Sequence, residues 1–238
     1  MEPVAHQIPW KAYHEAPGIN ASQLNAFARS PAYCLLRRSE PEKSTAALRI
    51  GVAVHGILLN HTDPKHVPEI TVAEVAKAVA MAESLGDNPD FKKLLAHTDA
   101  TEMSIFWERQ GIRCKARPDG YGRGFILDVK TTRDLKRFSP WSITDYGYHI
   151  QAGWYQIALE EALDRETDAF YFPVVQSTEP FETAVFRLHN DSLRAGRADA
   201  EALFAALVHA ETTGQWPRHF PGVKWAYVSW SELPHGGE

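Results

Sequence analysis

The amino-acid sequence predicts an α/β fold in which a central mixed β-sheet of about five strands is flanked by helices. Two observations lead to this expectation. Apolar residues recur at helical spacing through the first part of the chain, whereas alternating strand-like segments and further helices follow from about residue 100. No linker, internal repeat or low-complexity tract divides the 238 residues, which favours a single domain over residues 1–238.

The N-terminal part, about residues 18–97, is expected to be helical. Asn and Ser at helix starts accept hydrogen bonds from free backbone amides, and Pro fits the first helical turn. Longer helices are indicated where apolar side chains fall on one helical face. The expected helix starts and ranges are Asn20, Ser30–Pro31, 46–60, 71–85 and Asn88.

The core is expected over about residues 100–213. Period-two alternation bounded by turn residues predicts strands, and a capped apolar pattern predicts helices. The expected strands are 101–108, 112–117, 125–131, 168–176 and 181–188. The expected turns are 110–111 and 119–122, and the expected helices are 146–163 and 190–213, the latter capped by 190–192. The tail, 214–238, is rich in Trp and Pro and is expected to be irregular.

Composition narrows the class of protein. The chain is 44% hydrophobic and 11% aromatic, which argues against disorder. It has no run of 18 apolar residues and no secretory pattern at the N-terminus, so a cytoplasmic protein without a membrane partner is expected. Cys34 and Cys114 are isolated, which argues against a cysteine-based zinc or iron–sulfur site and indicates buried apolar residues. The histidines show no HExxH or HxH spacing.

Charge is distributed unevenly along the chain. The net charge is −5, but residues 109–137 hold nine basic and three acidic residues, so that this segment carries +6 and the remainder −11. A basic patch around paired acids suits a polyanion held over a metal ion. A solvated hairpin with charged outer faces is the alternative.

The acids and one lysine of this segment form the most informative motif. Pro118–Asp119 precedes Asp128–Val129–Lys130 by nine residues. In a strand, Asp128 and Lys130 would point to the same face, and Asp119 would lie at the turn that feeds the strand. Two carboxylates beside an ammonium can bind a hard divalent cation and activate water. A structural Asp–Lys ion pair is the alternative.

Five further groups could complete this site. The carbonyl of Val129 could face the metal, since carbonyl oxygens are ordinary ligands of such ions. Glu102 stands at the start of a neighbouring expected strand, although an exposed glutamate is the plainer interpretation. Gln151 and Tyr155 lie four apart on one helical face and could orient a phosphate or the attacking water, or could reflect ordinary amphipathicity. His55 on an apolar helix could equally be a core histidine.

Taken in order, these motifs resemble the PD-(D/E)XK nuclease superfamily. Within it they resemble the branch of exonuclease VIII (RecE type), lambda exonuclease and the RecB nuclease domain. Each motif alone is common, whereas their ordered combination spans nearly the whole chain. The matching strings are INASQL at 19–24, GVAVH at 51–55, RPD at 117–119, LDVKTT at 127–132, YHIQAGWY at 148–155 and Trp216–Pro217.

The resemblance implies a role for each candidate residue and excludes the iron–sulfur members, which need four cysteines. The two aspartates would bind metal beside a catalytic lysine, and a QxxxY motif would orient the DNA backbone. The implied roles are metal binding for Asp119 and Asp128, catalysis for Lys130, completion of the metal and water environment for His55 and Glu102, and the QxxxY motif for Gln151 and Tyr155.

The resemblance also implies an activity. It implies a Mg²⁺-dependent 5′-to-3′ exonuclease acting on ends of double-stranded DNA, with Mn²⁺ able to substitute. A ring-shaped homo-oligomer (trimer or tetramer) and a single-strand annealing protein as partner in phage recombination are implied as well. A structure-selective endonuclease of the same superfamily and a non-catalytic DNA-binding recombination scaffold are the alternatives. Arg29, Arg37 and Arg38 are candidates for binding a 5′-phosphate.

Overall fold

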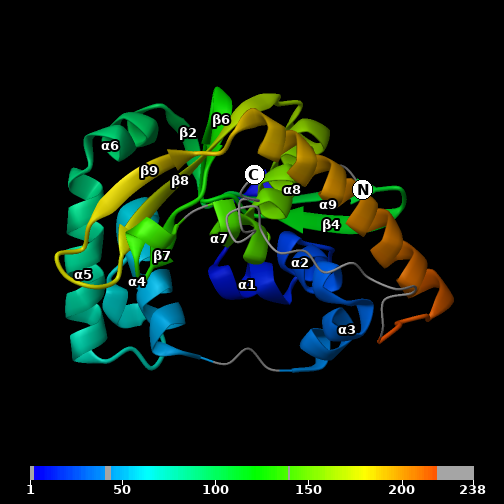
Figure 1. The fold of residues 1–238 in the computed structure, drawn as a ribbon, viewed down its shortest axis with the longest axis horizontal. Coiled ribbons are helices and arrows are strands. Elements are labelled where there is room, and N and C mark those ends of the chain that lie inside the picture. Colours follow the sequence, from blue (N-terminus) through cyan, green and yellow to red (C-terminus); the bar gives the residue numbers. More distant parts are fainter. Residues whose placement is uncertain (1–2, 41–43, 139, 219–238) are drawn as a thin grey trace, which may run out of the picture.

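Two β-sheets with helices around them make up the computed structural model, which describes residues 3–40, 44–138 and 140–218 (Figure 1). The larger sheet is mixed and has the strand order β2-β5-β6-β8-β7, with β9 paired to β8. The smaller sheet is antiparallel, in the order β1-β3-β4. The strands are β1 (Val4–His6), β2 (Thr98–Thr101), β3 (Ser104–Arg109), β4 (Ile112–Ala116), β5 (Gly120–Gly122), β6 (Gly124–Leu127), β7 (Lys130–Thr132), β8 (Thr167–Gln176) and β9 (Thr183–Arg187).

The helices cover both faces of the larger sheet. Figure 1 shows α4, α5 and α6 on one side, and α8 and α9 on the other. Short 3-10 turns lie at Pro64–His66 and Leu135–Arg137. The helices are α1 (Trp10–Glu15), α2 (Ala21–Arg29), α3 (Pro31–Ser39), α4 (Ala46–Asn60), α5 (Val72–Asp87), α6 (Pro89–Ala96), α7 (Pro140–Asp145), α8 (Tyr148–Leu163) and α9 (Asn190–Thr213).

Strands β6 and β8 serve two hydrophobic cores because their side chains alternate between the faces of the sheet. Ile126 and Phe170 are fully buried in the core built with α2, α8 and α9. Leu127 and Ala169 lie in the other core, with α4, α5 and α6. The predicted α/β fold with a mixed sheet between helices is therefore confirmed.

The predicted helices begin at or close to the residues that the sequence predicts. Asn20 and Gln23 form a capping box at the start of α2, and Thr71 and Glu74 form another at the start of α5. Helix α4 has the predicted bounds, 46–60. The cap of α9 is one residue earlier than predicted, because the ring nitrogen Nδ1 of His189 accepts from the amide of Asp191 at 3.2 Å.

The prediction of one strand over residues 101–108 is wrong. The chain bends at Glu102, where φ is 51°, so that β2 and β3 belong to different sheets. The bend is held by the amide of Glu102, which donates to the carbonyl of Asp119 at 3.0 Å. Glu102 thus lies between two strands and not at the start of one.

The predicted turn at 119–122 is instead the short strand β5, which pairs with β2 and β6. Its glycines reflect close packing, because a Cβ at Gly122 would lie 2.2 Å from the carbonyl oxygen of His97. The chain reverses direction between β5 and β6, where Gly124 has a φ of 82°.

The predicted strand 125–131 is interrupted at Asp128 and Val129, between β6 and β7. Leu127 pairs with Tyr171 and Lys130 with Val174, so the same number of residues separates the two pairs on both strands. The chain therefore keeps its register along β8 through the interruption. This preserved register leaves the side chains of Asp128 and Lys130 on one side, as the sequence predicts.

The sequence does not predict β1, α1 or α7. Helix α1 is attached to the small sheet by Lys115, which is buried although it is a lysine. Its Nζ donates to the carbonyl oxygens of Tyr13, His14 and Ala16 at 2.9, 3.1 and 2.7 Å. These are carbonyls at the end of α1, which the helix itself leaves without partners.

Three further expectations concern the burial of the two cysteines, the length of the helices relative to a membrane, and the C-terminal tail. Cys34 and Cys114 are each 1% exposed, as predicted. Across the described part of the chain, each helix is too short or too polar to span a membrane. Trp216 packs against Phe27, with ring centroids 6.2 Å apart, while the rest of the tail, 219–238, lies outside the described residues.

Candidate active site

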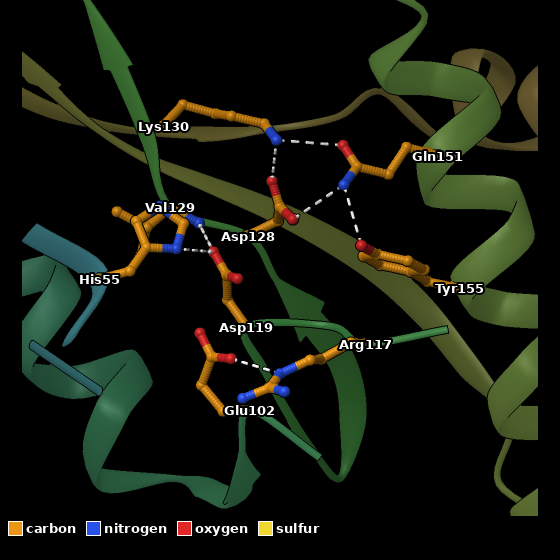
Figure 2. A network of polar contacts seen from close by, with 9 residues as sticks. All are labelled: His55, Glu102, Arg117, Asp119, Asp128, Val129, Lys130, Gln151 and Tyr155. Carbon is orange, nitrogen blue, oxygen red and sulfur yellow. Dashed lines mark hydrogen bonds and ion pairs between the residues drawn. The ribbon is translucent and has the colours of Figure 1, made fainter. Parts of the chain in front are cut away.

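The seven side chains singled out in the sequence come together at one end of the larger sheet, together with Val129 (Figure 2). They reach this place from both helical layers and from the strands between them. Their positions are His55 in α4, Glu102 between β2 and β3, Asp119 just before β5, Asp128 and Val129 between β6 and β7, Lys130 at the start of β7, and Gln151 and Tyr155 in α8.

One half of the site is a group of possible metal ligands. Ligand atoms of His55, Glu102 and Asp119 all lie within 4.8 Å of one another. The Nδ1 of His55 is 3.4 Å from Oδ2 of Asp119, and the amide of Val129 donates to this same oxygen at 2.6 Å. Two carboxylates and an imidazole at this spacing fit one divalent cation.

The other half is a hydrogen-bonded network around Lys130. Its Nζ forms an ion pair with Oδ2 of Asp128 and donates to Oε1 of Gln151 at 3.0 Å. The Nε2 of Gln151 donates to Oδ1 of Asp128 at 3.1 Å and to the hydroxyl of Tyr155 at 3.0 Å. The ammonium also lies 4.5 Å from the ring centroid of Tyr148.

Burial and neighbouring charges set the protonation of these groups. Burial lowers the pKa of His55, but the nearby carboxylate of Asp119 outweighs it and raises that pKa to about 9. Burial raises the pKa of Asp128 to about 6 against the opposing effect of Lys130. For Lys130, burial is outweighed by Asp128, so its pKa is raised. For Asp119, burial is outweighed by His55, so its pKa is lowered. An imidazole binds a metal ion only in its neutral form, so His55 would release a proton when it binds the cation.

The arrangement differs from the sequence prediction in how it uses Asp128 and Val129. Asp128 is not in the group of close ligand atoms, because its carboxylate is turned to Lys130 and Gln151. Val129 enters the site through its amide, which binds Asp119. Glu102 is in the group, although an exposed glutamate is the plainer interpretation of its sequence position.

Arg117 contacts the candidate site through Glu102, a contact that the sequence does not predict. It immediately precedes Pro118–Asp119, yet the only signal it gives is its place in the RPD string. Its Nε donates to Oε2 of Glu102 at 2.6 Å. Arg117 and Lys115 both point inward, so these two basic residues of segment 109–137 do not contribute to the basic patch that the sequence predicts.

The three arginines proposed for a 5′-phosphate all have protein partners. Arg29 lies over the ring of Tyr33, at 4.1 Å, and Arg37 pairs with Glu40 at 3.1 Å. Arg38 forms an ion pair with Glu211 and lies 5.2 Å from the ring centroid of Trp216. A phosphate would have to compete with these contacts.

Comparison with known protein families shows to which family the chain belongs. Residues 20–223 match the family described as a PDDEXK-like domain of unknown function (DUF3799). The chain belongs to this family. The predicted membership of the PD-(D/E)XK nuclease superfamily is thereby confirmed.

One solved structure shares the fold of this PD-(D/E)XK domain. The crystal structure of a "putative exonuclease" from Eubacterium rectale has a TM-score of 0.72 and 17% identity, covering 97% of this chain and 99% of that one. The structure of SSO0001 is more distant, with a TM-score of 0.34 and 12% identity over 78% of this chain and 86% of that one. No curated protein matches the sequence.

Proposed function

We propose that this PD-(D/E)XK protein is a Mg²⁺-dependent deoxyribonuclease, acting as a 5′-to-3′ exonuclease on ends of double-stranded DNA in phage or prophage recombination. One observation carries the proposal. The group of His55, Glu102 and Asp119, which fits a divalent cation, lies beside the charged Lys130 that is paired with Asp128. A cation site next to a fixed ammonium suits hydrolysis of a phosphodiester.

The donor set decides which cations the site would accept. His55, Glu102 and Asp119 would hold the ion, and the sequence adds Asp128 and the carbonyl of Val129 as further ligands. Carboxylates suit Mg²⁺ and Mn²⁺, whereas an imidazole is a better ligand for the transition metal, so Mn²⁺ is expected to substitute. A bound divalent cation would supply stabilisation of charge on the phosphate and a lowered pKa for water.

The other residues would orient and stabilise the reacting groups. Lys130 is held in a charged state between Asp128 and Gln151, so that its ammonium can offset charge developing on the phosphate. Tyr155 fixes the amide of Gln151 by accepting one of its N–H groups. A fixed amide and a fixed ammonium can position the attacking water with little reorganisation.

The polarity, the oligomer and the partner in this proposal rest on likeness to other proteins. The neighbour from Eubacterium rectale is described as an exonuclease, and the motifs resemble exonuclease VIII. The 5′-to-3′ polarity, a ring-shaped oligomer and a single-strand annealing partner are parts of the proposal that this likeness supports. The endonuclease and the non-catalytic scaffold remain the competing functions.

A single digestion experiment separates the three functions. End-labelled linear duplex DNA and a covalently closed circle are incubated with the protein in Mg²⁺ or in EDTA. An exonuclease releases nucleotides from the linear substrate alone, and only with Mg²⁺. Cleavage of the circle would favour the endonuclease, whereas DNA binding without nucleotide release would favour the scaffold. The position of the label gives the polarity.

Substitutions in the site test the assigned residues. Lys130→Ala and Asp128→Ala should each lower cleavage about 100-fold or more, the scale of losing one fixed electrostatic group. Lys92→Ala, which removes an exposed ion pair with Asp87, serves as the control and should leave the rate unchanged. Full activity in either site variant would remove that residue from the mechanism.

A further inference from the structure

Glu102 has an unusual backbone for a site residue. Its φ of 51° is left-handed, a conformation that is unfavourable for a residue with a side chain. Such a conformation persists where its surroundings determine it, and it often marks a functional position. Its side chain is 11% exposed, so the carboxylate is held among protein groups.

Arg117 holds the side chain of Glu102 from one side. Besides the bond from its Nε to Oε2 of Glu102, its Nη1 donates to the carbonyl oxygen of Ile8 at 3.0 Å and to the hydroxyl of Ser104 at 3.4 Å. The guanidinium is therefore anchored, and the side chain of Arg117 is only 11% exposed. Figure 2 shows the other oxygen of Glu102 pointing away from Arg117, towards Asp119 and His55.

The N-terminal segment supports this arrangement from outside the family-matched residues 20–223. Ile8 supplies the carbonyl for Arg117, and the side chain of Gln7 donates to the carbonyl of Thr101 at 3.0 Å, next to the bend. The ring of Tyr13 lies 5.8 Å from the guanidinium. The segment thus contacts both the bend and the arginine that holds it.

We propose that Arg117 is a positioning residue: it binds one oxygen of Glu102 so that the other oxygen joins His55 and Asp119 in binding a divalent cation. Its consequence for catalysis rests on the proposed function, but cation binding can be measured without DNA. Groups that orient metal ligands typically contribute about 10–100-fold in affinity.

Mn²⁺ titration of the full chain by calorimetry tests this role. Arg117→Gln should weaken Mn²⁺ binding about 10–100-fold relative to the wild type. In a Glu102→Gln background the same substitution should cost little more, because the ligand that Arg117 positions has already been changed. Arg109→Gln is the matched control, since Arg109 lies at the end of β3, is 17% exposed and pairs with Glu161 of α8. It should leave the affinity unchanged.

Several results would overturn the proposal. Unchanged binding in Arg117→Gln would do so, and tighter binding would show that the positive charge merely repels the cation. An equal loss in both Glu102 backgrounds would indicate a general structural role. If thermal melts show that Arg117→Gln does not fold, Arg117→Lys replaces it, and wild-type affinity there overturns the proposal. Absence of Mn²⁺ binding by the wild type would instead refute the proposed metal-dependent function.

Discussion

Gln151 connects Lys130 to the rest of the candidate site at the scale of single residues. Its amide oxygen accepts from Lys130, and its nitrogen donates to Asp128 and to the hydroxyl of Tyr155. An amide is the side chain that can accept and donate at once in this way. Glutamate has the same shape but, when ionised, has no hydrogen to donate.

Gln151→Glu should therefore lower kcat for digestion of linear duplex DNA about 100-fold, the scale of losing a positioned donor. The introduced carboxylate would lose the bond to Asp128 and face its charge. Initial rates at saturating DNA measure the effect, and Glu160→Gln on the same helix is the control. A kcat equal to that of the wild type would show that the amide has no part in the reaction.

Sequence spacing predicts some of these contacts and not others. The separation of four between Gln151 and Tyr155 is a helical repeat, so their hydrogen bond could be expected from local geometry. The contact of Arg117 with Glu102 could not, because it depends on a left-handed residue at a bend between two sheets. The orientation of Asp128 depends on competing partners that spacing does not reveal.

Two glycines set the distance between helices α8 and α9 at the scale of elements. A Cβ at Gly196 would lie 2.0 Å from the carbonyl oxygen of His149, and one at Gly153 would lie 2.4 Å from the amide nitrogen of Arg197. The backbones are thus in direct contact, since neither position has room for a side chain. This contact fixes the helix that carries Gln151.

Gly196→Ala should reduce the free energy of unfolding by about 1–3 kcal/mol, because the added methyl forces the two backbones apart. Urea denaturation followed by far-UV circular dichroism measures the change. Ala195→Ser, at the exposed neighbouring position of α9, should stay within about 0.5 kcal/mol of the wild type. Equal stability of Gly196→Ala and the wild type would mean that the helices separate freely.

Helices were easier to predict than strands for a physical reason. Caps such as Asn20 and Thr71 act on their own next few residues, so the local sequence contains the signal. The strands depend on partners distant in sequence. Gly120 and Gly122 resemble turn residues locally, but their lack of side chains serves the close packing of β5.

At the scale of the whole molecule, the site lies where the two helical layers meet. His55 comes from α4 in one layer, and Gln151 and Tyr155 come from α8 in the other, while the acids come from the segments that connect the strands. A cation held by His55, Glu102 and Asp119 would link segments distant in sequence. Binding to the folded chain alone stabilises it by mass action.

Mn²⁺ should therefore raise the thermal unfolding midpoint, with a stabilisation of about 2.7 kcal/mol when its concentration is 100 times Kd. Differential scanning fluorimetry in a Mn²⁺ series, reversed by EDTA, measures this. Asp119→Asn removes a ligand carboxylate and should abolish most of the shift. An equal shift in that variant would place the bound ions elsewhere on the protein.

The buried ammonium of Lys115 has a consequence for where this domain can be cut. Its three carbonyl acceptors belong to Tyr13, His14 and Ala16, all before residue 20, where the family match begins. A recombinant fragment starting at that match would lose all three acceptors and the ring of Tyr13, which lies 4.9 Å from the ammonium, and Lys115 would exchange these contacts for water. We therefore expect a fragment cut at the family boundary to be less stable than the full chain.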